Sequence, residues 1–203
     1  MSGPVDEAAP ATSPPAPPGP PPTRFTRRAL GMLVGLAVLV LAGDALIKQL
    51  AVAKLTGHAP IKLLGGLLYL DLARNSGAAF SLGTRLTFVF PLVTLAVATW
   101  IGWMAARLRS VPWAVALGLV LGGALGNLAD RLFRAPGFLV GHVIDYASLF
   151  GPNAQYWPIF NLADAALSCG VVLAVLLELF GRRRDGARAP ARRGEDTVRR
   201  DES

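Results

Sequence analysis

The sequence predicts a membrane protein of the all-α class: a bundle of four transmembrane helices with a small extracytoplasmic β-structure and one further external loop. Hydrophobic residues make up 53% of the 203 residues and charged residues only 16%. The mean hydropathy of +0.47 is higher than a soluble domain of average composition would have. Four apolar stretches follow one another along the chain, each close to the ~20 residues that an α-helix needs to cross a bilayer.

The two ends of the chain differ from this apolar middle. Nine of the sixteen prolines lie in the first 22 residues, which contain few large apolar side chains. Such a segment cannot bury a core. We therefore expect residues 1–24 to be a disordered Pro-rich tail, residues 25–180 to form one membrane domain, and residues 181–203 to be a disordered Arg-rich tail.

The predicted spans are residues 29–50, 86–108, 113–132 and 157–180. Four spans place both termini on one side of the membrane, and arginines flank them on that side. These are Arg24, Arg27, Arg28, Arg107, Arg109 and Arg182 to Arg184. The positive-inside rule places both termini in the cytoplasm, although the first external loop is also basic. The net charge of +7 is thus explained by membrane anchoring, and no nucleic-acid partner is expected.

An alternative for the first span is a cleavable export signal, because "TRRALGMLVGLAVLVLAGDA" has twin arginines and an apolar run. Three further spans follow, and no small-x-small cleavage site is evident. We therefore interpret it as a membrane helix.

Two segments between the spans are expected outside the membrane. Residues 61–82 contain short apolar runs broken by glycine and asparagine, which predicts two or three short strands. Residues 133–156 are rich in glycine and proline. They predict an irregular loop that returns to the membrane surface.

Polar residues within the spans are costly, at about 2.5–3.5 kcal/mol each for a charge at the helix centre, and usually face a protein interior. Asp44 and Lys48 are four residues apart and can neutralise each other as a structural anchor. Gly118, Gly122 and Gly126 recur every four residues, which favours close packing against another helix.

Asn127, Asp130 and Arg131 share one face of the third span. Asp130 and Arg131 can form an interfacial ion pair. Alternatively, Asn127 and Arg131 offer donors to a substrate backbone or a lipid headgroup.

Asp164 in "FNLAD" has no basic residue within one helical turn. If the helix begins at Trp157, Asp164 lies about 10 Å inside it. Asp145 precedes this helix, and the intervening loop contains Gly151 and Pro152, which allow the chain to fold back. Two carboxylates in a poorly hydrated site share a proton, which supplies a base and an acid together.

Other chemistry is less well supported by the sequence. Cys169 is interpreted as a small apolar filler. His142, Asp145 and Asp130 form a conceivable metal site, but no H-E-x-x-H pattern is present. We expect neither a metal nor an organic cofactor.

Four segments in order, "NSGAAFS" (75–81), "GGALGNLADR" (122–131), "GHVIDY" (141–146) and "FNLAD" (160–164), resemble the lipoprotein signal peptidase (signal peptidase II) family. The resemblance covers roughly residues 30–180. It implies an aspartic endopeptidase of the bacterial inner membrane that removes signal peptides from diacylglyceryl-modified prolipoproteins.

The resemblance also implies roles for individual residues. Asp145 and Asp164 match the catalytic aspartates. The substrate-binding positions are Asn75, Asn127, Arg131 and Asn161, and the positions that support the fold are Asp44, Lys48 and Asp130. The implied partners are a lipid-modified prolipoprotein and membrane lipids, with the protein as a monomer.

Two further hypotheses remain from the residues alone. A proton-coupled transporter would use Asp44, Asp145 and Asp164 as relay sites. A membrane scaffold would use these carboxylates only to hold the helices together.

Overall fold

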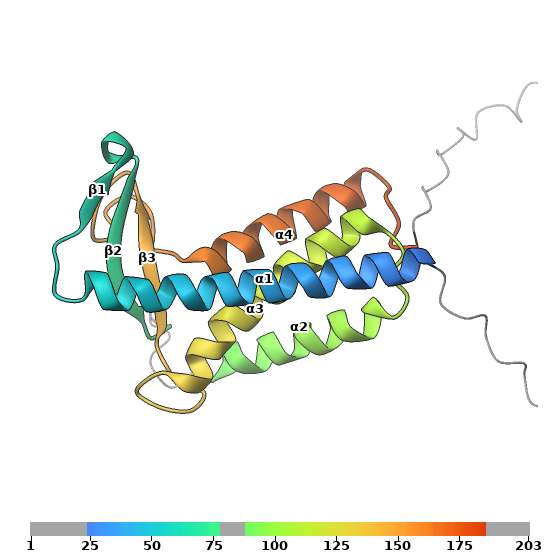
Figure 1. The fold of residues 1–203 in the computed structure, drawn as a ribbon, viewed down its shortest axis with the longest axis horizontal. Helices are drawn as coiled ribbons and strands as arrows, with labels where there is room; N and C mark the ends of the chain where they lie inside the picture. Colours follow the sequence, from blue (N-terminus) through green and yellow to red (C-terminus); the bar gives the residue numbers. More distant parts are fainter. Residues whose placement is uncertain (1–23, 78–87, 186–203) are drawn as a thin grey trace, which may run out of the picture.

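The computed structural model describes residues 24–77 and 88–185. Four helices lie side by side, and a small antiparallel sheet covers one end of the bundle (Figure 1). The helices are α1 (Arg24–Leu55), α2 (Val89–Ala105), α3 (Val111–Phe133) and α4 (Leu162–Leu179). The strands are β1 (Ile61–Leu63), β2 (Leu68–Asn75) and β3 (Val143–Leu149), with the short 3-10 turn η1 (Leu64–Gly66) between the first two.

Each predicted span overlaps one helix, so the order of helices is confirmed, although α1 and α3 extend beyond the predicted 29–50 and 113–132. Three of them, α1, α3 and α4, are long and apolar enough to cross a membrane, whereas α2 is a shorter apolar helix. Their outward faces are apolar, as Leu39 (68% exposed), Trp103 (63%) and Leu179 (76%) illustrate. Such surfaces fit a lipid environment, because soluble proteins rarely expose contiguous apolar surface of this extent to water.

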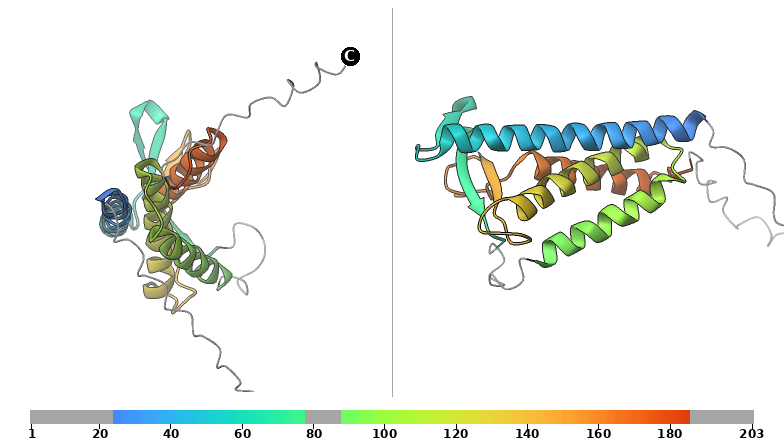
Figure 2. Two further views of the ribbon diagram at one scale, coloured as in Figure 1. Left: turned by 90° about the vertical axis from the view of Figure 1, so that its right-hand side faces the viewer. Right: turned by 60° about the horizontal axis from the view of Figure 1, so that its bottom comes forward.

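Helix α3 is the centre of the bundle and packs against the other three helices, as the end-on view shows (Figure 2). The predicted glycine stripe faces α1. A Cβ atom at Gly118 would lie 2.8 Å from the carbonyl oxygen of Leu33, and one at Gly122 would lie 2.8 Å from that of Ala37. Glycine therefore allows the two backbones to touch, which confirms the packing interpretation.

The sheet has the order β1-β2-β3 with antiparallel neighbours. Strands β1 and β2 come from the segment predicted to be extended, whose last residues, 78–82, lie outside the described residues. Strand β3 corrects our prediction of an irregular loop over residues 133–156. It is buried along almost its whole length and pairs with β2 some 70 residues earlier, which local sequence patterns do not reveal.

The start of α4 is a second correction. The helix begins at Leu162, after Asn161 as its N-cap, and not at Trp157. Asparagine is among the preferred N-cap residues, since its side chain accepts a hydrogen bond from a free backbone N–H. Asp164 consequently lies in the first turn of the helix, not two turns inside it.

Candidate active site

Asp145 and Asp164 come from different elements that meet where the sheet covers the bundle. Asp145 lies on β3, and Asp164 is the third residue of α4. Asp164 forms a capping box with Asn161. The Asn161 Oδ1 accepts a hydrogen bond from the backbone N of Asp164 (2.9 Å), and Asp164 Oδ2 accepts one from the backbone N of Asn161 (3.2 Å).

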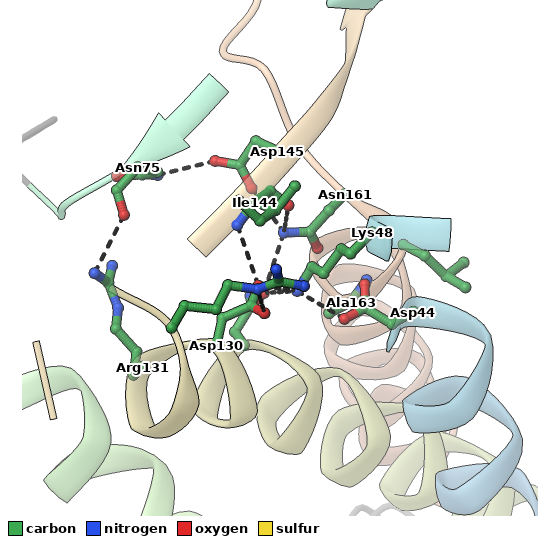
Figure 3. Close-up of polar contacts among 12 residues, drawn as sticks. Asp44, Lys48, Asn75, Asp130, Arg131, Ile144, Asp145, Asn161 and Ala163 are labelled. Carbon is green, nitrogen blue, oxygen red and sulfur yellow. Dashed lines mark hydrogen bonds and ion pairs between the residues drawn. The ribbon is translucent and has the colours of Figure 1, made fainter. Parts of the chain in front are cut away.

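Asn161 also reaches the second carboxylate. Its Nδ2 donates to Asp145 Oδ1 (2.7 Å), with further contacts to Asn127 Oδ1 (3.1 Å) and the carbonyl of Ile144 (3.3 Å). Figure 3 shows Asn161 and Asn75 on the two sides of Asp145. One buried amide, only 1% exposed, therefore holds both predicted catalytic residues in position.

The two aspartates share the wall of a cavity of about 410 Å³. The other polar side chains on this wall are Asn75, Thr94, Asn127 and Arg131, and the apolar part includes Phe90, Pro91, Val93, Leu128 and Leu167. Three of the four predicted substrate-binding residues thus line the cavity. The fourth, Asn161, lies behind the wall and positions the carboxylates.

Each aspartate receives one further amide donor from a cavity residue. Asn75 Nδ2 donates to Asp145 Oδ2 (3.1 Å), and Asn127 Nδ2 donates to Asp164 Oδ1 (2.7 Å). Hydrogen bonds from neutral amides orient a carboxylate without neutralising its charge. Both carboxylates are thus held in defined orientations.

Burial and the charge of Asp164 raise the pKa of Asp145 to about 6, against hydrogen bonds from Asn75 and Asn161 and the charge of Lys48, which lower it. A buried carboxyl beside a second carboxylate holds its proton longer because both charges cannot be solvated together. The pair therefore has the property needed to exchange a proton near neutral pH.

Arg131 links the cavity wall to the sheet. Its Nη1 donates to the carbonyl oxygens of Asn75 (3.2 Å) and Gly141 (3.0 Å), and its guanidinium lies 5.8 Å from the centroid of the Phe90 ring. Our alternative of an ion pair between Asp130 and Arg131 is wrong. Asp130 pairs with Lys48 and Arg134 instead.

A buried ion network supports the site from the side of α1. Lys48 Nζ lies 2.7 Å from Asp44 Oδ2 and 2.9 Å from Asp130 Oδ2, and it donates to Asn127 Oδ1 (3.0 Å). The predicted pair between Asp44 and Lys48 is confirmed. Since Asn127 donates in turn to Asp164, Lys48 also determines which way this amide points.

The two aspartates of this network also accept hydrogen bonds from backbone N–H groups. Asp44 Oδ1 accepts from Ala163 (2.9 Å) at the start of α4, and Asp130 Oδ2 accepts from Ile144 (3.1 Å) on β3. The network thereby attaches α4 and β3 to α1 and α3 at the residues next to Asp164 and Asp145.

Sequence reasoning missed two residues of this region. The Tyr146 hydroxyl oxygen accepts a hydrogen bond from the backbone N of Leu162 (3.1 Å), which helps to place the start of α4. Burial raises the pKa of Tyr146 to about 12, so the phenol stays neutral. Arg134 is the second partner of Asp130. The position of Tyr146 beside Asp145 in "GHVIDY" was the one available signal.

The residues of the conceivable metal site, His142, Asp145 and Asp130, are not arranged to bind a metal ion together. Both Asp130 oxygens already contact cations and a backbone N–H, so Asp130 is not free to join His142 and Asp145 around a metal. Within the described ranges, no three His, Cys, Asp or Glu side chains are arranged to hold a metal ion. Cys169 corrects our prediction of a packed filler, because it is exposed on the outer surface of α4.

The sequence matches the family described as signal peptidase (SPase) II over residues 36–180. This stretch contains both aspartates, the amides around them and the whole ion network. The chain belongs to the signal peptidase II family.

Named relatives and solved structures agree with this membership. The chain is 46% identical over 168 residues to the lipoprotein signal peptidase of Rhodococcus jostii (strain RHA1), covering 83% of this chain and 82% of that protein. It is 44% identical over 177 residues to that of Mycobacterium tuberculosis (strain ATCC 25618 / H37Rv), covering 87% and 82%. A bacterial membrane enzyme solved by the in meso method at 1.9 Å resolution has a similar fold. The TM-score is 0.64 with 27% identity, over 73% of this chain and 93% of that chain.

Proposed function

We propose that this signal peptidase II is an aspartic endopeptidase that removes the signal peptide from diacylglyceryl-modified prolipoproteins, with Asp145 and Asp164 as its catalytic pair. The observation that carries the proposal is the double role of Asn161. Its amide donates to Asp145 while its carbonyl oxygen accepts from the backbone of Asp164. Both carboxylates also line one cavity.

The proposed reaction uses one water molecule. Asp164 takes a proton from the water as its oxygen attacks the carbonyl carbon of the scissile peptide bond. Asp145, the member of the pair with the raised pKa, gives its proton to the peptide nitrogen as the C–N bond breaks. The products are an amine and a carboxylic acid, which loses its proton to water, and proton transfer from Asp164 to Asp145 restores the starting state.

The remaining polar residues of the cavity would position the substrate. Asn75, Asn127 and Arg131 present donors along the wall, which suit the carbonyl groups of an extended peptide. The apolar wall, with Phe90 and Leu167 among its residues, suits the apolar side chains of a signal peptide. Arg131 is already bound to two backbone carbonyls, so its first role is to hold the wall together.

We infer that α2 is a fourth membrane span and that both termini face the cytoplasm. The active site then lies near the outer face, at the end covered by the sheet. A substrate with acyl chains in the outer leaflet is held at the depth of this cavity. Restricting the substrate in this way lowers the entropic barrier to cleavage.

The test is to incubate the purified protein with a diacylglyceryl-modified prolipoprotein and to follow the mass of the product. We expect wild type to release the signal peptide, and Asp145→Asn and Asp164→Asn to release it at least about 100-fold more slowly. Asp71→Asn is the matched control, because Asp71 is a buried aspartate on β2 that accepts from the backbone of Asn153 and does not line the cavity. Cleavage by both dyad variants at the wild-type rate would refute the proposal.

A further inference from the structure

A second cavity lies at the end of the bundle opposite the sheet, between the end of α2 and the segment that follows α4. Its volume of about 630 Å³ exceeds that of the active-site cavity. None of the peptidase residues reaches it. It is lined by Trp100, Trp103, Met104, Arg107, Glu178 and residues 181–185.

The arginines of this cavity are held in place by the backbone around them. The carbonyl oxygen of Arg182 accepts a hydrogen bond from Trp113 Nε1 (2.6 Å), and that of Arg184 accepts from the backbone N of Arg109 and Ser110 (3.1 Å each). These bonds attach the first residues of the predicted C-terminal tail to the start of α3 and to the turn before it. The positive charges are thereby gathered at one site.

Aromatic rings orient two of these guanidinium groups. Arg107 lies 5.2 Å from the centroid of Trp103, and Arg184 lies 4.9 Å from that of Trp113 and 5.9 Å from that of Trp100. Arg184 is also 4.0 Å from Glu178. The four arginines outnumber the two carboxylates of Glu178 and Asp185, so the cavity retains a net positive charge.

The surroundings indicate a ligand that is part lipid. Trp100 and Trp103 are 47% and 63% exposed, as is typical of rings at the boundary between lipid and water. Leu179 and Phe180, beside the lining residue Glu178, are 76% and 78% exposed. A charged headgroup bound among the arginines would therefore have apolar surface beside it for its acyl chains.

We propose that this cavity binds the phosphodiester headgroup of an anionic phospholipid of the cytoplasmic leaflet. Guanidinium groups suit phosphate because their donors form a planar fork, and a basic pocket between membrane helices is a suitable place for such a headgroup. The proposal requires the bundle to cross the membrane with this end in the cytoplasm. It does not depend on the peptidase chemistry.

The experiment uses the full chain in uncharged detergent micelles, titrated with phosphatidylglycerol and, separately, with zwitterionic phosphatidylcholine. Bound lipid is counted by native mass spectrometry. We expect phosphatidylglycerol to bind more tightly, and Arg107→Gln and Arg183→Gln each to weaken its affinity about fivefold, equivalent to ~1 kcal/mol per arginine. Arg74→Gln, the same change in an exposed arginine on β2 at the other end, should leave the affinity unchanged.

Three outcomes would overturn the proposal. The first is that both lipids bind with equal affinity. The second is that the cavity variants bind phosphatidylglycerol like wild type. The third is that Arg74→Gln weakens binding as much as the cavity variants do. Glycerol 3-phosphate, which has the same phosphate chemistry without acyl chains, is a further arm. If it displaces the lipid at equal concentration, the site binds a soluble anion and the lipid assignment is wrong. Thermal unfolding of the lipid-free variants establishes that they fold. If Arg107→Gln does not fold, the test rests on Arg183→Gln, because Arg183 has an exposed side chain.

Discussion

Two clusters of acidic residues lie next to each other in this protein and are compensated in different ways. Asp44 and Asp130 surround the ammonium group of Lys48. Asp145 and Asp164 contact the amides of Asn75, Asn127 and Asn161 instead. Within residues 24–77 and 88–185, no ion pair joins either of the latter aspartates to a cation.

One fold therefore keeps some carboxylates unreactive and leaves others available to exchange protons. A carboxylate paired with a buried cation is tied to its partner, because losing either charge leaves the other unpaired in a poorly solvated place. A carboxylate held by neutral amides can gain or lose a proton at smaller cost, and here it also faces a cavity. Asn127 joins the two clusters, since it accepts from Lys48 and donates to Asp164.

The largest effect should come from the same substitution made in each cluster. We expect Asp164→Asn to lower kcat/KM by about 10²–10⁴-fold, as loss of a general base does. The free energy of unfolding should change by less than about 1 kcal/mol, because an amide oxygen can still cap the helix. Asp44→Asn should have the opposite profile, with reduced stability and a smaller loss of activity. Cleavage kinetics measure the activity of each variant, and denaturant unfolding in micelles measures its stability. If Asp164→Asn and Asp44→Asn lose activity and stability to the same extent, the two clusters do not differ in role.

Removal of the central cation is the next test. Lys48→Met leaves Asp44 buried without a counter-charge and leaves Asp130 paired with Arg134 alone, which should cost about 3–5 kcal/mol of stability. The double variant that adds Asp44→Asn removes the unpaired charge and should regain part of the loss. Denaturant unfolding in mixed micelles follows the change. If Lys48→Met unfolds like wild type, the ion network does not support the fold.

A smaller loss of stability is expected from a methyl group placed against the ion network. A Cβ atom at Gly126 would lie 2.7 Å from Asp44 Oδ2 and 3.1 Å from Ala163 Cβ. Gly126→Ala should therefore cost about 1–3 kcal/mol through overpacking. Gly31→Ala on α1 is the matched control, since nothing lies within 4 Å of its added Cβ, and it should stabilise the helix by about 0.5–1 kcal/mol. Thermal unfolding of Gly126→Ala and Gly31→Ala separates the effect of crowding from that of helix propensity. Equal changes in Tm for the two variants would contradict the predicted overpacking at Gly126.

The smallest effect concerns the amides around the catalytic pair. Asn75 donates to the ionised form of Asp145 and so lowers its pKa. Asn75→Ala removes this donor, so the pKa should rise above about 6 and the acid form should persist to higher pH. A net hydrogen-bond contribution of about 0.5–1.5 kcal/mol corresponds to a shift of roughly 0.4–1 pH unit.

The measurement is the pH dependence of kcat/KM. In wild type, activity should fall as pH rises through about 6, where Asp145 loses its proton, and in Asn75→Ala this limb should move to higher pH. Gln155→Ala, a change in an exposed residue of the same end of the molecule, should leave the limb in place. A limb that moves to lower pH would show that Asn75 favours the protonated acid.

Contacts within one helix could be predicted from the sequence. The pair of Asp44 and Lys48 follows from a spacing of four residues, and the glycine stripe on α3 follows from the same periodicity. Asp145 and Asp164 stood out because each is an acid among apolar residues, and the four family motifs contain them. These features depend on local geometry, which an α-helix of 3.6 residues per turn makes regular.

The tertiary structure alone decided which distant residues meet. Strand β3 formed where an irregular loop was expected, because its partner β2 lies far away in the chain. Asn161 is an N-cap that contacts both aspartates, and Lys48 on α1 pairs with Asp130 on α3. The physical reason is that long-range hydrogen bonds and ion pairs depend on how whole elements pack, whereas sequence periodicity reports only on neighbours within one element.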